Sequence, residues 1–187
     1  MDKKSKFLLL QVNDALFPIG GYSHSYGLET YIQKELVTNA AEAESYIRNK
    51  LTQNLLYNEL FFCRLAWERG QAQDMEGLQE LEEVLEAGKV PSEIREASKK
   101  MGSRFAKTLK NCGIVYETPV FLRYLEKKKN GSVHHVIAYG IFCSSIGISL
   151  EDCLEHFLYA QTSAMVTNCV KSIPLSQTTG QQILVSC

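Results

Sequence analysis

The amino-acid sequence predicts an all-α protein that forms one bundle of about seven to nine helices. Apolar residues recur at helical spacing along most of the chain, whereas the alternation typical of strands is almost absent. The length of 187 residues is typical of one domain, and no internal repeat or low-complexity linker divides the chain. We therefore expect a single domain over residues 1–187.

The longest expected helix covers residues 39 to 69. Its apolar positions are spaced so that they share one helix face, and they are Ile47, Leu51, Leu55, Phe62 and Leu65. Thr38 or Asn39 can cap the start of this helix, and Gly70 stands where a C-terminal cap is expected.

The next segment, residues 74 to 86, predicts a short helix with an acidic outer face. It has no basic residue and contains six acids, namely Asp74, Glu76, Glu80, Glu82, Glu83 and Glu86. Leu78, Leu81 and Leu85 fall on the other side of the helix. A solvated face is the simpler interpretation, and a docking surface for a basic partner is the alternative.

A further helix is expected to follow the chain break at Pro91, with Ser92 as its cap. Its apolar face is formed by Ile94, Ala97, Met101, Phe105 and Leu109. Residues 120 to 126 fit either a short helix or a strand, and Asn130-Gly131 signals a turn.

The stretch from His135 to Val170 predicts two closely packed helices, over residues 136–147 and 150–170. Both are poor in charged residues, so we expect both to lie at the centre of the core. A last helix is expected over residues 174 to 185. Its apolar end lacks a polar stop, which suggests a chain truncated at its C-terminus.

The composition is that of an ordinary globular protein. A formal net charge of −1 argues against a dedicated nucleic-acid binder. The six cysteines show no C-x-x-C pair and no zinc-ligand spacing, so we expect reduced thiols in a cytoplasmic protein. The apolar runs near the N-terminus and over residues 136–150 are too short for a secretion signal or a membrane span. No membrane association is therefore predicted.

The densest local motif runs from Phe17 to Glu29 and contains the pair Gly20-Gly21. Two adjacent glycines after a proline favour a turn with positive φ, and Ser23 can cap the helix that follows. The motif lacks the lysine of a phosphate-binding loop and the second glycine of a nucleophile elbow. No catalytic residue is predicted.

The four histidines, His24, His134, His135 and His156, form no H-x-x-x-H pair. His24 lies in the glycine-rich motif, where a surface or turn role is the simpler interpretation and a transient metal contact is the alternative. We therefore predict no metal site in this chain.

A second dense motif runs from Asn168 to Gln181, and Pro174 within it separates two helices. Lys171 is expected near the C-terminus of the first helix, where a cation is favoured, and Ser172 can cap the second. An ordinary corner between two helices is the simpler interpretation.

Taken together, the motifs resemble those of the UreF family of urease accessory proteins. The family pattern P-[IV]-G-[GS]-[FY]-[ST]-x-S-x-G-L-E is complete from Pro18 to Glu29. A middle signature is matched by Glu93, Arg95, Ser98 and Gly102, and a late signature is matched from Asn168 through Gln181. The resemblance covers nearly the whole chain, but family members usually continue into a basic tail that helps to bind the partner UreD.

The resemblance implies a maturation factor without catalytic activity. UreF-like proteins are all-helical dimers that bridge UreD, also called UreH, and the GTPase UreG, and the complex delivers nickel to apo-urease. A homodimer is therefore expected, with no cofactor bound by this chain and with nickel and GTP handled by the partners. Two alternatives are a generic helical interaction scaffold with an acidic docking face, and an enzyme of unrecognised type that uses Ser23 and His24.

The resemblance also indicates which residues contact partners. The glycine-rich loop is expected to face a partner, and Glu29 and Lys171 are expected to present charge beside it. Arg95 has a structural alternative, which is to pair with nearby acids. The full predicted set is Pro18, Gly20, Gly21, Tyr22, Ser23, His24, Glu29, Arg95, Lys171, Pro174, Leu175 and Gln177.

Overall fold

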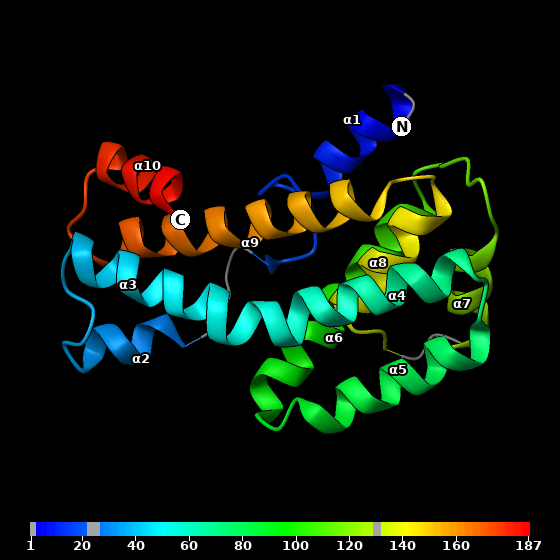
Figure 1. The fold of residues 1–187 in the computed structure, drawn as a ribbon, viewed down its shortest axis with the longest axis horizontal. Coiled ribbons are helices and arrows are strands. Elements are labelled where there is room, and N and C mark those ends of the chain that lie inside the picture. The colour runs from blue at the N-terminus through cyan, green and yellow to red at the C-terminus, as the bar shows by residue number, and fades with distance from the viewer. Residues whose placement is uncertain (1–2, 22–26, 129–131) are drawn as a thin grey trace.

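The described part of the chain is all-α, which confirms the predicted fold class (Figure 1). The structure is a computed structural model, and it describes residues 3–21, 27–128 and 132–187. The elements are α1 (Lys3–Val12), α2 (Leu28–Gln33), α3 (Ala40–Lys50), η2 (Leu51–Leu60), α4 (Phe61–Gln71), α5 (Met75–Gly88), α6 (Ser92–Lys110), α7 (Val120–Lys127), α8 (His135–Ser145), α9 (Leu150–Ser172) and α10 (Gln177–Ser186). Residues 120–126, ambiguous from sequence, are helical, and the predicted turn at Asn130-Gly131 lies outside the described residues.

The centre of the fold is α8, because every residue of this helix is buried. It packs most extensively on α4 and next on α6. Gly140 permits the close approach of α4, since a Cβ at this position would lie 2.5 Å from the Cys63 carbonyl oxygen. The prediction that α8 lies in the core is confirmed. For α9 the prediction is wrong in part, since Leu158 and Tyr159 are exposed.

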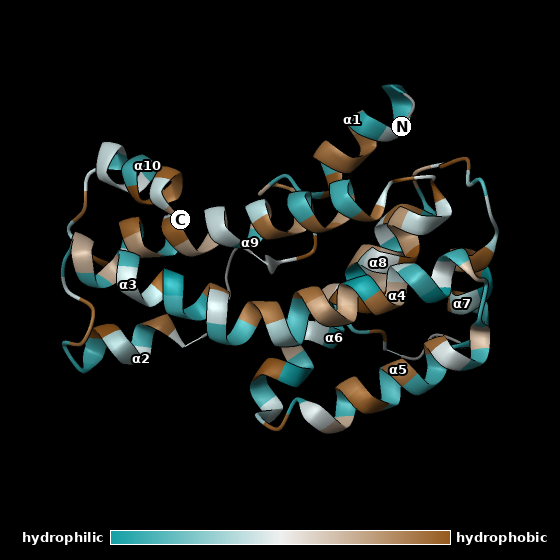
Figure 2. Ribbon diagram, in the orientation of Figure 1, coloured by the Kyte–Doolittle hydropathy of each residue, from teal (hydrophilic) through white to brown (hydrophobic). Residues whose placement is uncertain are grey.

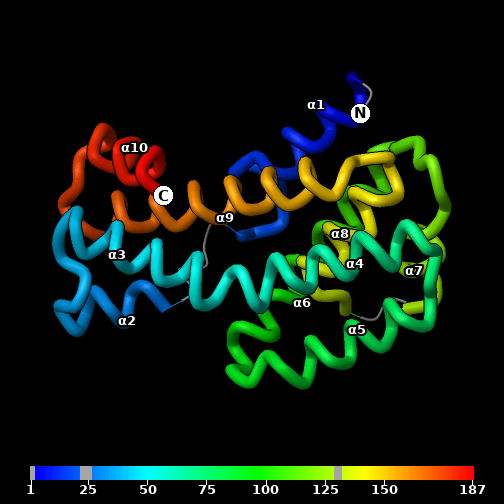
Figure 3. Tube along the Cα trace, viewed as in Figure 1, coloured from blue at the N-terminus to red at the C-terminus, as the bar shows by residue number. Residues whose placement is uncertain are grey.

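Two apolar clusters lie at different ends of the bundle. The larger cluster is built mainly from α4 to α8 and includes Phe105, Phe121 and Phe142. The smaller cluster joins α2, α3, α10 and the C-terminal half of α9, and it includes Leu28 and Ile47. The continuous rod α3–η2–α4 and the long helix α9 run lengthwise through the molecule (Figures 1 and 3). Each contributes residues to both clusters. These two rods therefore hold the two ends of the molecule together.

The rod α3–η2–α4 confirms the long helix that the sequence predicts, but it contains a π-helical segment. Asn39 caps its start by accepting a hydrogen bond from the Glu42 amide. The wider π turns shift the buried face, so that Cys63 and Ala66 are buried in α4 while the predicted Phe62 and Leu65 are only partly buried. Gly70 is not a C-terminal cap; it is buried within α4 against Ser144.

The amphipathic helix α5 alternates between hydrophobic and hydrophilic colours along its length (Figure 2). Its three predicted leucines are buried. The prediction that all its acids face outward is wrong, because Glu82 is buried and accepts hydrogen bonds from the Tyr124 hydroxyl (2.6 Å) and the His134 amide (2.7 Å). Glu86 also turns toward other elements, where it contacts His134 and Lys99.

Two predicted helix caps are wrong. Ser92 is the first residue of α6 and makes no capping bond, because Pro91 occupies the N-cap position. Ser172 is the last residue of α9, and the cap of α10 is Ser176, whose hydroxyl accepts a hydrogen bond from the Thr179 amide. Within the described residues, no helix is long and apolar enough to cross a membrane.

Candidate functional site

The described part of the glycine-rich motif lies against α6. Gly20 adopts a positive φ of 78°, as the sequence predicts, and the Arg104 guanidinium donates a weak hydrogen bond to the Ile19 carbonyl oxygen at 3.4 Å. Phe17 is buried against Phe105, with ring centroids 5.8 Å apart, while Pro18 is exposed. These contacts fix the start of the motif to the core and leave Pro18 available to a partner. Tyr22, Ser23 and His24 lie outside the described residues.

Glu29 lies in the first turn of α2 and is exposed. The helix begins after Gly27, which has a φ of 94°, a conformation that glycine adopts without strain. The neighbouring Leu28 is buried in the smaller cluster and anchors the helix. The local fold therefore holds the backbone of Glu29 in place while its carboxylate points to solvent.

The corner between α9 and α10 carries the other predicted charge. Lys171 is exposed in the last turn of α9, where a positive charge interacts favourably with the helix dipole. Pro174 and Gln177 are exposed, whereas Leu175 is partly buried against the smaller cluster. Because α2 packs on α9, Glu29 and this corner belong to the same end of the molecule (Figure 3).

Arg95 lies apart from that end, on α6 next to the turn that follows α5. Its Nη1 donates a hydrogen bond to the Lys89 carbonyl oxygen at 3.1 Å, and its Nε lies 3.4 Å from a Glu86 carboxylate oxygen. The structure therefore gives Arg95 the structural pairing that was the alternative from sequence. It does not bring Arg95 together with Glu29 and Lys171.

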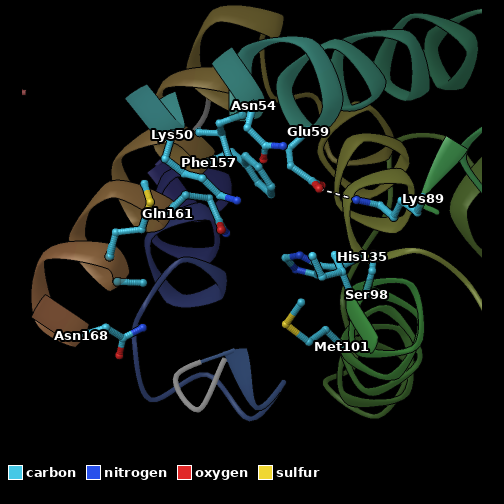
Figure 4. Close-up of a pocket in the computed structure, with 14 residues that line it drawn as sticks. Lys50, Asn54, Glu59, Lys89, Ser98, Met101, His135, Phe157, Gln161 and Asn168 are labelled. Atoms are coloured by element: carbon cyan, nitrogen blue, oxygen red, sulfur yellow. Dashed lines mark hydrogen bonds and ion pairs between the residues drawn. The ribbon is translucent and has the colours of Figure 1, made fainter. Parts of the chain in front are cut away.

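A central cleft, which the sequence did not predict, separates the two apolar clusters. One part is lined by η2, α6 and α9 and holds about 40 Å³. The other part lies beside residues 12–21 and holds about 300 Å³. The two parts share Met101, His135 and Phe157 as walls, so we treat them as one cleft. Figure 4 shows Lys50 and Gln161 on one side of the open space and His135 and Met101 on the other.

The His135 side chain is buried in the wall of this cleft. Phe105, Tyr139 and Phe157 surround its ring at centroid distances of 5.3 to 6.2 Å. Burial away from water lowers the pKa of His135 to about 4. Its Nε2 is buried and has no hydrogen-bond partner among the described residues. The ring is therefore neutral near pH 7 and presents an unsatisfied polar atom.

Charged groups on the η2 side of the cleft do not cancel. Lys89 is buried and pairs with Glu59, whereas the ion pairs among the described residues include none for Lys50. Burial lowers the pKa of Lys50, nearby Glu59 raises it, and Lys89 lowers it again. This part of the cleft therefore holds two ammonium groups against one carboxylate, whereas Asp14 lines the other part.

A second buried polar group lies behind the cleft, at the junction of α5, α6 and α8. The His134 ring contacts the Ser98 hydroxyl at 3.0 Å through Nδ1 and Glu86 at 2.9 Å through Nε2. Burial is the largest influence on His134 and lowers its pKa. Every ring nitrogen of this histidine has a partner, so we assign His134 a structural role.

Within the described residues, no group of three or more potential ligands is arranged to hold a metal ion. The cysteines in this part of the chain are free thiols, and Cys63, Cys143, Cys153 and Cys169 are buried.

A family model and the similar proteins named below all point to the same family, UreF. The UreF family model matches residues 37–187. Proteins named "Urease accessory protein UreF" are similar over almost all of this chain. One from Bacillus sp. (strain TB-90) is 35% identical over 95% of this chain and 78% of its own length. One from Corynebacterium glutamicum (strain R) is 33% identical over 98% of this chain and 80% of its own length. One from Haemophilus influenzae (strain PittGG) is 37% identical over 94% of this chain and 74% of its own length.

Proposed function

This chain belongs to the UreF family of urease accessory proteins, and we propose that it bridges UreD/UreH and the GTPase UreG during GTP-dependent delivery of nickel to apo-urease. Membership over nearly the whole chain is the observation that carries this proposal. It supports a role in urease maturation, in which this chain bridges the two partners.

The geometry supports a surface that binds proteins. Glu29 and the α9–α10 corner are exposed at one end of the bundle, and each is anchored by a buried neighbour. A charged group on a fixed backbone can set the register of a partner at low entropic cost. We propose that Glu29, Lys171, Pro174 and Gln177 contact a partner there. We also propose that the motif from Pro18 to His24, whose described start lies against α6, contacts a partner.

The absence of catalysis and of a resident cofactor is also part of the proposal. Its support is that the relatives are named accessory proteins. We propose that the partners handle nickel and GTP. We further propose a homodimer, which light scattering on the purified protein would measure directly. An acidic docking face on α5 is less well supported, because Glu82 and Glu86 turn toward other elements.

The bridging role is tested by co-purification with UreD/UreH and UreG. We expect the wild-type chain to form a complex that contains both partners. Glu29→Ala and Lys171→Ala are expected to weaken retention of UreG by at least tenfold while the free energy of unfolding changes little, since both side chains are exposed.

Glu83→Ala provides the matched control, because Glu83 is also an exposed helical carboxylate but lies on α5. This variant is expected to retain UreG as the wild type does. Full retention of UreG by both Glu29→Ala and Lys171→Ala would exclude that end of the molecule as the contact surface.

A further inference from the structure

The central cleft has the features of a ligand site rather than of a packing defect. It is bounded by helices from both apolar clusters, and its volume of about 300 Å³ in the larger part falls at the small end of known ligand sites. A simple packing void is apolar on all sides, but this cleft has polar groups on opposite walls (Figure 4).

The unpaired nitrogen of His135 is the first observation that points to a ligand. The side chain is only 8% exposed and lines both parts of the cleft. A buried polar atom without a hydrogen-bond partner destabilises the fold. A neutral imidazole can satisfy that atom by a hydrogen bond to a ligand in the cleft.

The second observation is the charge on the facing wall. Glu59 is matched by Lys89, while Lys50 lines the same space without an ion-pair partner among the described residues. Glu59 is the one carboxylate among the residues that line this part of the cleft. Asp14 lines the other part of the cleft, so the preference for charge applies to the part beside Lys50. There an anionic group would be attracted to Lys50, and a cationic group would be repelled.

The remaining wall of the cleft is apolar, and it determines that the uncharged part of the ligand is apolar too. Leu55, Ile94, Met101, Phe157 and Met165 line the cleft between the polar groups. These side chains cannot satisfy the oxygens of a highly hydrated anion such as phosphate, but they can pack against a hydrocarbon or aromatic group.

We propose that the cleft between the two apolar clusters binds a small organic carboxylate, with the carboxylate directed toward Lys50 and the apolar body between Met101 and Phe157. This function is additional to the protein contacts proposed above. Its test does not involve urease or its partners, so either proposal can fail alone.

The methionine methyl groups provide the readout. Met101 and Met165 line the cleft, whereas Met75 packs against the larger cluster elsewhere. Titration of the purified protein with benzoate should shift the Met101 and Met165 methyl resonances saturably and leave Met75 unchanged. Benzyl alcohol, the neutral analogue, and benzylamine, the cationic analogue, should bind at least tenfold more weakly.

Two variants and a control test the assignment of residues. Lys50→Met should weaken benzoate binding at least tenfold, and His135→Phe should weaken it by about threefold or more while it preserves the aromatic surroundings. Lys127→Met makes the same change of charge at an exposed position on α7 and should bind benzoate as the wild type does.

The proposal is overturned if benzoate causes no saturable shift of Met101 or Met165 in the folded wild-type protein. Equal affinity for benzoate and benzyl alcohol would overturn the assignment of an anion, as would unchanged affinity in Lys50→Met. The benzoate titration uses the wild-type protein, so its result does not depend on whether a variant folds.

Discussion

At the scale of single residues, Gly140 shows how one missing side chain positions two helices. A Cβ there would lie 2.5 Å from the Cys63 carbonyl oxygen and 2.9 Å from the Ala66 Cβ, both on α4. Gly140→Ala is therefore expected to lower the free energy of unfolding by about 1–3 kcal/mol, because backbone atoms cannot move aside as a flexible side chain would. Urea unfolding measures this change.

Gly88→Ala is the control for that substitution. Gly88 ends α5, and a Cβ there would have nothing within 4 Å. The change should leave the free energy of unfolding unchanged or raise it by up to about 1 kcal/mol. Equal destabilisation by the two substitutions would contradict the close packing of α8 on α4.

The buried carboxylate of Glu82 gives a second prediction. It accepts hydrogen bonds from the Tyr124 hydroxyl and from the His134 amide. Glu82→Gln replaces one accepting oxygen with a donor and is expected to lower the free energy of unfolding by about 2 kcal/mol. The adjacent Glu83 is exposed, so Glu83→Gln should change it by less than about 0.5 kcal/mol. A comparable loss in both variants would mean that Glu82 makes no special contribution.

His135 predicts a loss of stability in mild acid. An unfolded histidine has a pKa near about 6.5, whereas burial lowers the pKa of folded His135 to about 4. As the pH falls from about 6.5 toward 4, the unfolded chain takes up a proton that the folded chain does not, so stability decreases in this window. Between pH ~7.5 and ~5.0, the wild type should lose about 2 kcal/mol more than His135→Phe.

Urea unfolding at the two pH values measures that difference. His134, whose pKa burial also lowers, is present in both proteins and does not enter the comparison. Parallel pH profiles for the wild type and His135→Phe would show that His135 becomes protonated in the folded state as readily as in the unfolded state.

The sequence predicts residues with local roles better than residues with distant partners. The positive φ of Gly20 follows from its neighbours, and Asn39 is one of the two caps that the pattern allows. The pairing of Glu82 with Tyr124, 42 residues away, depends on how α5 meets α7. Nothing in the acidic run distinguishes Glu82 from Glu83, which is why the whole run was predicted to face solvent.

At the scale of elements, the π-helix η2 shows where helical periodicity fails. The sequence predicts the rod from residue 39 to 69 correctly, but a constant period of 3.6 residues cannot locate a wider turn. The apolar face that the sequence predicts is therefore confirmed at Ile47, before η2, and at Leu55, within it, because both residues are buried. In α4 the buried face is shifted away from the predicted residues. The shift leads α4 to present Cys63 and Ala66 to α8.

The same π-helix is joined to the turn after α5 by the ion pair between Glu59 and Lys89. Lys89 is 8% exposed and Glu59 is 21% exposed, so the pair is poorly solvated. Lys89→Met is expected to lower the free energy of unfolding by about 2–3 kcal/mol, because it leaves a carboxylate without its partner. The double variant Glu59→Gln/Lys89→Met should recover at least about 1 kcal/mol of the summed losses.

An exposed ion pair in the same rod is the control for the change in the free energy of unfolding expected of Lys89→Met. Arg64 and Glu68 form an ion pair in α4 with side chains 58% and 39% exposed. Arg64→Met should lower the free energy of unfolding by less than about 0.5 kcal/mol. Strictly additive losses for Glu59 and Lys89 would show that the two side chains are not coupled.

At the scale of the whole molecule, two apolar clusters are linked by two long helical rods. The charged residues that the sequence singled out, Glu29 and Lys171, belong to the end with the smaller cluster, while the cleft lies between the clusters. Glu29 and Lys171 could be predicted from the sequence because each lies in a dense local motif. The sequence motifs missed the cleft because Lys50, Met101, His135 and Phe157 come from four separate elements, and only the packing brings them together.

We propose that this UreF-family chain supports urease maturation through contacts with partner proteins. The most direct measurement is urease activity and bound nickel in cells that carry urease and the other accessory genes but lack their own UreF, with and without this chain. We predict that the chain restores both quantities and that Glu29→Ala together with Lys171→Ala restores them at least tenfold less. If stable, folded wild-type chain restores neither urease activity nor nickel content, this chain does not act in urease maturation.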